Sequence, residues 1–263
     1  MRVALGLEYV GEHFSGWQTQ ANRATVQDVL ERALAAIAGE PVATICAGRT
    51  DSGVHATSQV VHFDFAGQRP LTAWVRGVNS HLPSGVSVQW AAEVPDSFHA
   101  RFSAQARRYR YVLYNAAIRP ALLQGRVGWY HWPLDEDRMQ AAARMLIGTH
   151  DFSSFRAAEC QANSPVRVMY DIQVQRQGNF MFFDFYANAF LHHMIRNIVG
   201  VLVYIGQGKD PVSWMVELLA LKDRKRAAPT FMPDGLYLCG VDYPGVIELP
   251  QQGLLHRLPV LIG

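Results

Sequence analysis

The sequence has few cysteines, few lysines and no long apolar run, and each shortage excludes a class of protein. Its three cysteines, Cys46, Cys160 and Cys239, lie far apart and form no CxxC pair. Neither a disulfide framework nor a zinc finger is therefore expected. No stretch reaches the roughly eighteen consecutive apolar residues of a membrane span, and the N-terminus turns polar too soon for a signal peptide. We expect a cytoplasmic protein that has no membrane partner.

The charge balance does not identify a partner. A net charge of +2 is too small to indicate a nucleic-acid-binding protein without a clustered patch. Only three of the 24 basic residues are lysines, Lys209, Lys222 and Lys225. Arginine's planar fork suits phosphate recognition and base stacking, but a coding bias toward arginine gives the same excess. The arginine content is compatible with an RNA partner and does not establish one.

With 263 residues, 49% of them hydrophobic, the chain is long enough for one large core or two small ones. Its first part has the periodicities of a β-α-β-β-α-β unit, the ferredoxin-like or RRM-like order. Thr25 is the expected N-cap of the clearest helix, which ends at Gly39. The expected elements are strands at 3–9, 43–47, 58–65 and 86–94 and helices at 25–39 and 72–81.

The second part repeats this order with longer insertions, and an extra helix is predicted to open with Asp210 as N-cap and Pro211 as its first residue. The sequence thus predicts an α/β (α+β) fold of two ferredoxin-like halves, residues 1–104 and 105–244. We expect a joined, mainly antiparallel central sheet with helices on one side and an irregular tail at 245–263. The expected elements are strands at 107–115, 166–176, 180–187 and 236–241 and helices at 135–148 and 192–208.

The run AGRTDSGVHA places the carboxylate of Asp51 in a loop with glycines on both sides, two residues after Arg49. Flanking strands would hold such a loop rigid, as a catalytic group requires, and Arg49 is suited to orient an RNA phosphate. Spacing alone is more typical of an ordinary Asp-Ser-Gly turn, because such turns are among the commonest loop signals.

Four blocks of the chain together resemble the tRNA pseudouridine synthase A family, in the family's order and from about Val3 to Pro244. They are GRTDSGVHA followed by SQVVHFDF, then ARFSAQARRYRYVLYN, DFSSFRA and ANAFLHHMIRNIVG. The resemblance implies an isomerase that converts uridine to pseudouridine at nucleotides 38, 39 and 40 of the tRNA anticodon arm, with the base flipped out. It also implies no metal, no organic cofactor and a homodimer.

The resemblance makes Asp51 the catalytic nucleophile. A carboxylate either attacks the nucleoside covalently or stabilises positive charge at C1′. Attack at C1′, attack at C6 of the base and elimination at the ribose all remain open. Because burial beside a stacked base raises the pKa of a carboxyl group, a nearby cation is needed, and Arg196 is the candidate. An exposed helix arginine is its alternative role.

The resemblance also implies that Tyr109 stacks on the flipped uracil, a contact worth roughly 1–3 kcal/mol; a plain core aromatic is the alternative. Arg107, Arg108 and Arg110 surround it as candidate RNA contacts, or form a solvated charge run. Leu236 is expected to pack against the target base or to be a strand-core leucine.

Two other pairs suggest chemistry and are rejected. His192 and His193 lack an HExxH arrangement and an acidic partner at ligand spacing, so no metal is expected. Ser52 and His55 are three residues apart in a loop, which does not define a hydrolytic triad. Two other functions stay open, a noncatalytic RNA-binding module and a carboxylate glycosidase that acts on free nucleosides.

Overall fold

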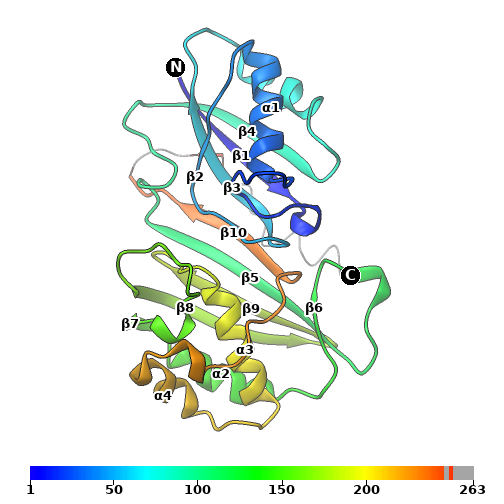
Figure 1. The fold of residues 1–263 in the computed structure, drawn as a ribbon, viewed down its shortest axis with the longest axis vertical. Coiled ribbons are helices and arrows are strands. Elements are labelled where there is room, and N and C mark those ends of the chain that lie inside the picture. Colours follow the sequence, from blue (N-terminus) through cyan, green and yellow to red (C-terminus); the bar gives the residue numbers. More distant parts are fainter. Residues whose placement is uncertain (246–248, 251–263) are drawn as a thin grey trace. The chain divides into compact units, whose positions relative to one another are not determined.

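The computed structural model describes residues 1–245 and 249–250, so the predicted irregular tail at 245–263 lies largely outside the described residues (Figure 1). The described chain forms two compact units. The first unit contains residues 1–105 and takes up the chain again at Tyr237, and the second is Ala106–Leu236.

The first unit has the predicted β-α-β-β-α-β order. Strand β1 lies between β4 and β3, and β2 pairs with the other edge of β3, all antiparallel. Strand β10 pairs with the same edge of β3 in parallel, through Tyr237 and Leu238. The elements are β1 (Arg2–Tyr9), η1 (Gly11–His13), α1 (Val26–Ala38), β2 (Ile45–Cys46), β3 (His55–Asp64), η2 (Ala73–Gly77), β4 (Val86–Val94) and β10 (Leu236–Asp242).

Helix α1 begins and ends where its sequence predicts. The hydroxyl of Thr25 accepts a hydrogen bond from the backbone N–H of Asp28, as expected for an N-cap. Gly39 ends the helix in the left-handed conformation, φ 81°, which costs little without a Cβ. The second predicted helix differs, because its centre at Ala73–Gly77 is a π-helix.

The helices of the first unit cover one face of its strands (Figure 1). Trp74 of η2 packs edge-on against Phe63 and Phe65 of β3, and Gly77 of η2 lies against Ile37 of α1. A second apolar cluster contains side chains from β1, β3 and β4 together with Ala47, Phe98, Ala100 and Tyr243. Both groups hold β3 in place, and β3 is the strand that follows the segment carrying Asp51.

The second unit contains a sheet in the order β5-β9-β8-β7, antiparallel throughout, with β6 parallel to β5. Strands β6 and β7 were not predicted. The elements are β5 (Ala106–Asn115), η3 (Ala121–Leu123), β6 (Gly128–Tyr130), α2 (Glu136–Arg144), β7 (Gly148–Asp151), η4 (Ser153–Phe155), β8 (Val166–Gln177), β9 (Phe180–Ala187), α3 (Met194–Gly206), α4 (Trp214–Leu221) and η5 (Arg224–Arg226).

The start predicted for the extra helix was wrong. Helix α4 begins at Trp214, with Ser213 in the N-cap position, instead of at Pro211. The backbone N–H of Trp214 donates to the carbonyl of Pro211, an i→i−3 bond of a tight opening turn. Asp210 and Pro211 therefore open a turn that leads into the helix.

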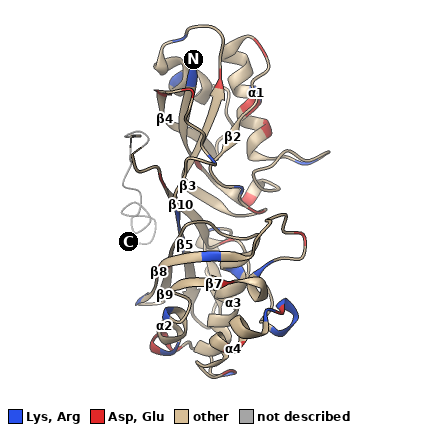
Figure 2. Ribbon diagram, turned by 90° about the vertical axis from the view of Figure 1, so that its left-hand side faces the viewer, with Lys and Arg blue, Asp and Glu red and all other residues tan. Residues whose placement is uncertain are grey.

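The mixed α/β class with mainly antiparallel strands is confirmed. Among the described residues no helix is both long and apolar enough to cross a bilayer. Figure 2 shows Lys and Arg scattered over both units with Asp and Glu among them, in keeping with the small net charge. Recognition of a polyanion would thus depend on individual arginines.

Candidate active site

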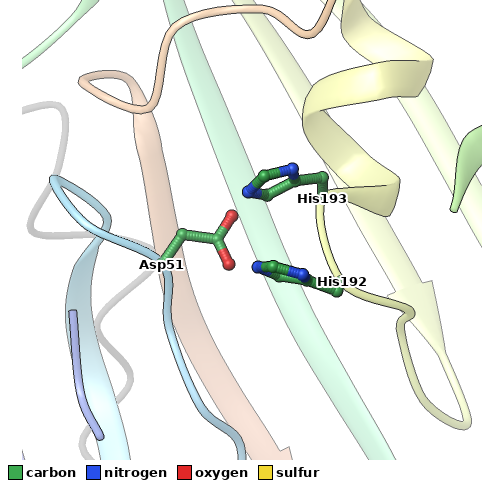
Figure 3. A group of neighbouring side chains, drawn as sticks. All are labelled: Asp51, His192 and His193. Atoms are coloured by element: carbon green, nitrogen blue, oxygen red, sulfur yellow. The ribbon is translucent and has the colours of Figure 1, made fainter. Parts of the chain in front are cut away.

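Asp51 lies in the loop between β2 and β3, which we call the Asp51 loop and define as Gly48–Val54. The side chain is half-buried, and Figure 3 shows its carboxylate projecting from the turn. The N–H of Val54 donates to the carbonyl of Asp51 at 3.1 Å, and Gly53 adopts φ 80°. A glycine is needed at that backbone conformation, so the turn depends on this residue type.

A second segment, Gly11–Trp17, packs against the backbone of the Asp51 loop; we call it the backing turn. The N–H of Trp17 donates to the carbonyl of Thr50 at 3.0 Å, and Ser52 Oγ donates to the carbonyl of Phe14 at 3.3 Å. A Cβ on Gly16 would lie 2.8 Å from the Thr50 oxygen and 3.1 Å from the carbonyl carbon of Asp51. The close approach therefore requires glycine at position 16.

Buried polar side chains hold the same loop from the direction of the sheet. The Tyr9 hydroxyl and Thr50 Oγ1 share a 2.8 Å hydrogen bond, and Gln59 Nε2 donates to the carbonyl of Gly48 at 2.7 Å and to the Tyr9 hydroxyl at 3.4 Å. Burial raises the pKa of Tyr9 above its ordinary value, so its hydroxyl stays protonated. Two strands thus fix the loop through two side chains, Tyr9 of β1 and Gln59 of β3.

Arg49 is exposed on the Asp51 loop. Burial raises the pKa of the neighbouring Cys46 thiol to about 12, and the positive charge of Arg49 opposes that rise. Cys46 is thus a protonated, buried thiol. An exposed guanidinium two residues from Asp51 is suited to a phosphate of a bound RNA.

His55 and Ser52 bond to different parts of the backing turn. His55 is buried, its Nδ1 accepts from the N–H of Gly11 at 3.0 Å, and its ring stacks on Tyr237 with centroids 4.6 Å apart. Ser52 donates to a backbone carbonyl. These bonds give both residues a part in holding the loop.

In the second unit, Tyr109 lies in the middle of β5 opposite Phe185 of β9. It is 9% exposed, and its ring meets Phe190 edge to face at 5.0 Å. Phe190 belongs to the segment between β9 and α3. The Tyr109 ring is therefore almost fully buried and packs against this segment.

The three arginines around Tyr109 lie on both faces of the sheet, because side chains alternate along a strand. Arg107 shares the face of Tyr109 and donates to the carbonyl of Asn188 at 2.9 Å. Arg108 and Arg110 point to the opposite face. There the Arg108 guanidinium lies over the Tyr186 ring, and Arg110 makes a bidentate ion pair with Asp184. Of the three, only Arg107 lies on the same face of the sheet as Tyr109.

Arg196 and Leu236 lie in the second unit, at the start of α3 and at the start of β10, respectively. Arg196, in the first turn of α3, donates from Nε to the carbonyl of Phe231 at 2.9 Å, and the N–H of Phe231 donates back to the Arg196 carbonyl. Leu236 is buried at the start of β10. The segment that leads to β10 thus fixes the direction of the Arg196 side chain.

His192 and His193 directly precede α3, and their rings lie 4.0 Å apart (Figure 3). His193 is in the N-cap position with φ 61°, the left-handed region. Such a conformation is uncommon for a non-glycine residue and often marks a functional segment.

A family model described as tRNA pseudouridine synthase matches residues 7–103 and 142–244. The chain belongs to the tRNA pseudouridine synthase family. The "tRNA pseudouridine synthase A" of Dechloromonas aromatica is 63% identical over 251 residues, covering 95% of this chain and 96% of that protein. Proteins of the same name from Aromatoleum aromaticum and Pseudomonas aeruginosa are 59% and 54% identical over 98% and 100% of this chain, respectively. They are covered over 98% and 94% of their own lengths.

Membership in the tRNA pseudouridine synthase family makes the chain an isomerase and confirms the resemblance drawn from the four sequence blocks. The matched ranges include the Asp51 loop, the backing turn and the start of α3. They begin at Leu7 and so also include Tyr9.

Sequence reasoning missed the supports of the Asp51 loop, which are Tyr9, Gly16 and Gln59. Tyr9 and Gln59 lie at ordinary positions of strand patterns, where a polar side chain predicts no particular partner. The signal for Gly16 is its place between an aromatic segment, HFS, and Trp17 in a region without periodicity. A glycine there indicates a close backbone approach, but not which segment approaches.

Proposed function

We propose that this synthase isomerises uridine to pseudouridine at nucleotides 38, 39 and 40 of the anticodon arm of tRNA, with Asp51 as the nucleophile and the target base flipped out. The observation that carries the proposal is the support of the Asp51 loop from two directions, by the backing turn and by buried Tyr9 and Gln59. A catalytic carboxylate needs such a rigid support.

The reaction breaks the bond between N1 of uracil and C1′ of the ribose, rotates the base and joins C5 to C1′. C5 loses its proton and N1 takes up a proton, so the product is an isomer of the substrate. A carboxylate at Asp51 serves by attacking the nucleoside or by stabilising positive charge at C1′. No oxidant, reductant or external group is consumed. The chemistry therefore needs no cofactor.

We assign the other predicted residues to the same uridine and its neighbours. Tyr109 stacks on the flipped uracil, Arg196 supplies the positive charge that keeps Asp51 ionised, and Leu236 packs against the base. Arg49 contacts a phosphate near the target nucleotide.

Arg107, Arg108 and Arg110 are the further proposed RNA contacts. They differ in what binding requires of them, because Arg110 must leave its ion pair with Asp184 before it can bind a phosphate. Breaking that ion pair should reduce the contribution of Arg110 to binding.

We further propose that the enzyme acts in the cytoplasm as a homodimer, organised as halves 1–104 and 105–244 with a tail at 245–263. The tRNA is its macromolecular substrate. Light scattering of the purified protein tests the dimer, for which twice the monomer mass of 29.4 kDa is expected.

Release of tritium from tRNA that contains 5-tritiated uridine tests the reaction. Formation of each pseudouridine removes the proton from C5, so release should match the pseudouridine found after nuclease digestion and mass spectrometry. A purely RNA-binding protein would release no tritium. A glycosidase would give free uracil and would act on nucleosides without tRNA structure.

A further inference from the structure

Phe102 is an exposed aromatic side chain on a hydrogen-bonded turn of the first unit. It is 76% exposed, and the turn that carries it runs from Phe98 to Ser103; we call it the Phe102 turn. Phe98 and Ala100, in the same turn, are fully buried. The turn is thus anchored in the core and presents one aromatic ring to solvent.

Hydrogen bonds fix this turn at both ends and in the middle. Ser103 and His99 bond twice, from Ser103 N–H to the His99 carbonyl at 2.8 Å and from His99 N–H to Ser103 Oγ at 3.0 Å. The N–H of Ala100 donates to Nδ1 of buried His62, and its carbonyl accepts from the Tyr243 hydroxyl at 2.6 Å. The backbone that carries the ring therefore loses little conformational entropy when a ligand binds.

The surroundings of the ring suit a nucleobase. His99 stacks on Phe102 with centroids 4.3 Å apart and planes 29° apart, and the Arg101 guanidinium lies 5.6 Å from the ring centroid. The N–H groups of Arg101 and Phe102 both donate to Nδ1 of His99. These bonds, and a pKa that burial and nearby arginines lower, keep His99 neutral. A neutral ring extends the stack without repelling Arg101.

Two positive charges lie on this side of the first unit. Arg49 and Arg101 are both exposed, and both act electrostatically on the same buried thiol, Cys46. Arg101 belongs to the Phe102 turn, and Arg49 belongs to the Asp51 loop, two residues before Asp51. The two segments therefore place guanidinium groups near one side chain, that of Cys46. Aromatic faces interleaved with arginines are the usual surface for unpaired nucleotides.

We propose that Phe102, backed by His99 and flanked by Arg101, is a stacking site for an unpaired base of the bound tRNA, with Arg101 on an adjacent phosphate. This inference rests on the proposed tRNA substrate. It adds a contact beyond the target uridine, because it concerns a second base that the enzyme holds but does not modify.

Among the described residues, two large hydrophobic side chains are more exposed than Phe102, and both are aliphatic. Leu122 is 98% exposed and Ile118 is 80% exposed, but neither has an aromatic face on which a base can stack. Single exposed apolar residues of this kind are normal. Leu122 therefore provides a matched control for loss of exposed apolar surface.

Filter binding of an unmodified tRNA transcript to Phe102→Ala, Phe102→Tyr and Leu122→Ala tests the site. A base–aromatic stack is worth roughly 1–3 kcal/mol, so Phe102→Ala should weaken binding about 5- to 150-fold. Phe102→Tyr should bind within about threefold of the parent because the ring face is retained, as should Leu122→Ala. Arg101→Gln should reduce the slope of log Kd against log salt by about 1.

Binding of Phe102→Ala within twofold of the parent would overturn the proposal. A changed molar mass of Phe102→Ala in light scattering, with tRNA affinity unaltered, would also overturn it and would assign the ring to a contact between copies of the chain. Thermal unfolding of each variant identifies loss of fold. If Phe102→Ala loses affinity while the parent forms no pseudouridine, the stacking site stands and the proposed reaction fails.

Discussion

Replacing Gly16 with alanine should displace the Asp51 loop and slow the reaction with little loss of fold. A Cβ at this position would lie 2.8 Å from the carbonyl oxygen of Thr50, a separation that real Cβ atoms essentially never show. The loop or the backing turn must therefore shift by about half an ångström to restore ordinary packing. A misplacement of about 1 Å at a catalytic group costs roughly 100-fold, so we expect kcat to fall about tenfold.

Gly39→Ala is a matched control for the backbone cost. Gly16 and Gly39 have φ of 88° and 81°, and a Cβ on Gly39 meets nothing within 4 Å. Both substitutions should cost about 1 kcal/mol for a left-handed alanine and lower Tm by about 2–4 °C. Only Gly16→Ala adds a collision with the loop.

The assay is single-turnover conversion of a tRNA transcript, combined with filter binding and thermal unfolding. We expect Gly16→Ala to bind tRNA within about threefold of the parent while its turnover falls, and Gly39→Ala to match the parent in both. Equal turnover of the two variants at saturating tRNA would refute the argument that the backing turn positions Asp51.

Three further predictions follow from single contacts. Tyr9→Phe removes a buried hydroxyl that bonds to Thr50 and Gln59, so Tm should fall by about 3–8 °C. Because the hydroxyl helps to hold the Asp51 loop, kcat should fall more than tRNA affinity. An unchanged Tm in calorimetry would contradict this. Burial lowers the pKa of His62 to about 4, aided by the charge of Arg2, so its unfolded state binds the proton first and the protein should lose stability as pH falls from 6.5 toward 4. His62→Asn should lose less over that range in urea titrations, because its side chain accepts a hydrogen bond without titrating. Tyr109→Leu should lower kcat at least tenfold if its ring stacks on uracil, and full turnover in the tritium-release assay would exclude that role.

Local features of the sequence predicted the fold well. The N-cap at Thr25 and the left-handed Gly39 are decided by neighbouring residues, and the alternation of β5 placed Tyr109 and Tyr111 on one face. The prediction of a helix start failed where a tight turn and a helix are both compatible with the same residues. At Pro211 an opening turn of i→i−3 bonds precedes α4, and the helix begins at Trp214.

The candidate site was predictable only in part. The motif around Asp51 is local in the sequence, whereas the residues that hold its loop are brought to it by the fold. The position of Asp51 in a tight loop between two strands was predictable from the motif that surrounds it. The contacts of Gly16 and Gln59 with the Asp51 loop join residues that are far apart in the chain, and strand periodicity does not contain that information. The ion pair of Arg110 with Asp184 likewise depends on the register of β5 against β9.

Mapping of pseudouridines in tRNA after incubation with the parent enzyme and with Asp51→Asn tests the central claim most directly. Asparagine retains the size of the side chain but lacks the negative charge, so tRNA affinity and thermal stability should be retained. The parent should convert uridines at nucleotides 38 to 40, and Asp51→Asn should convert none. Pseudouridine formed by Asp51→Asn at the parent's rate would contradict the assignment of Asp51 as the nucleophile.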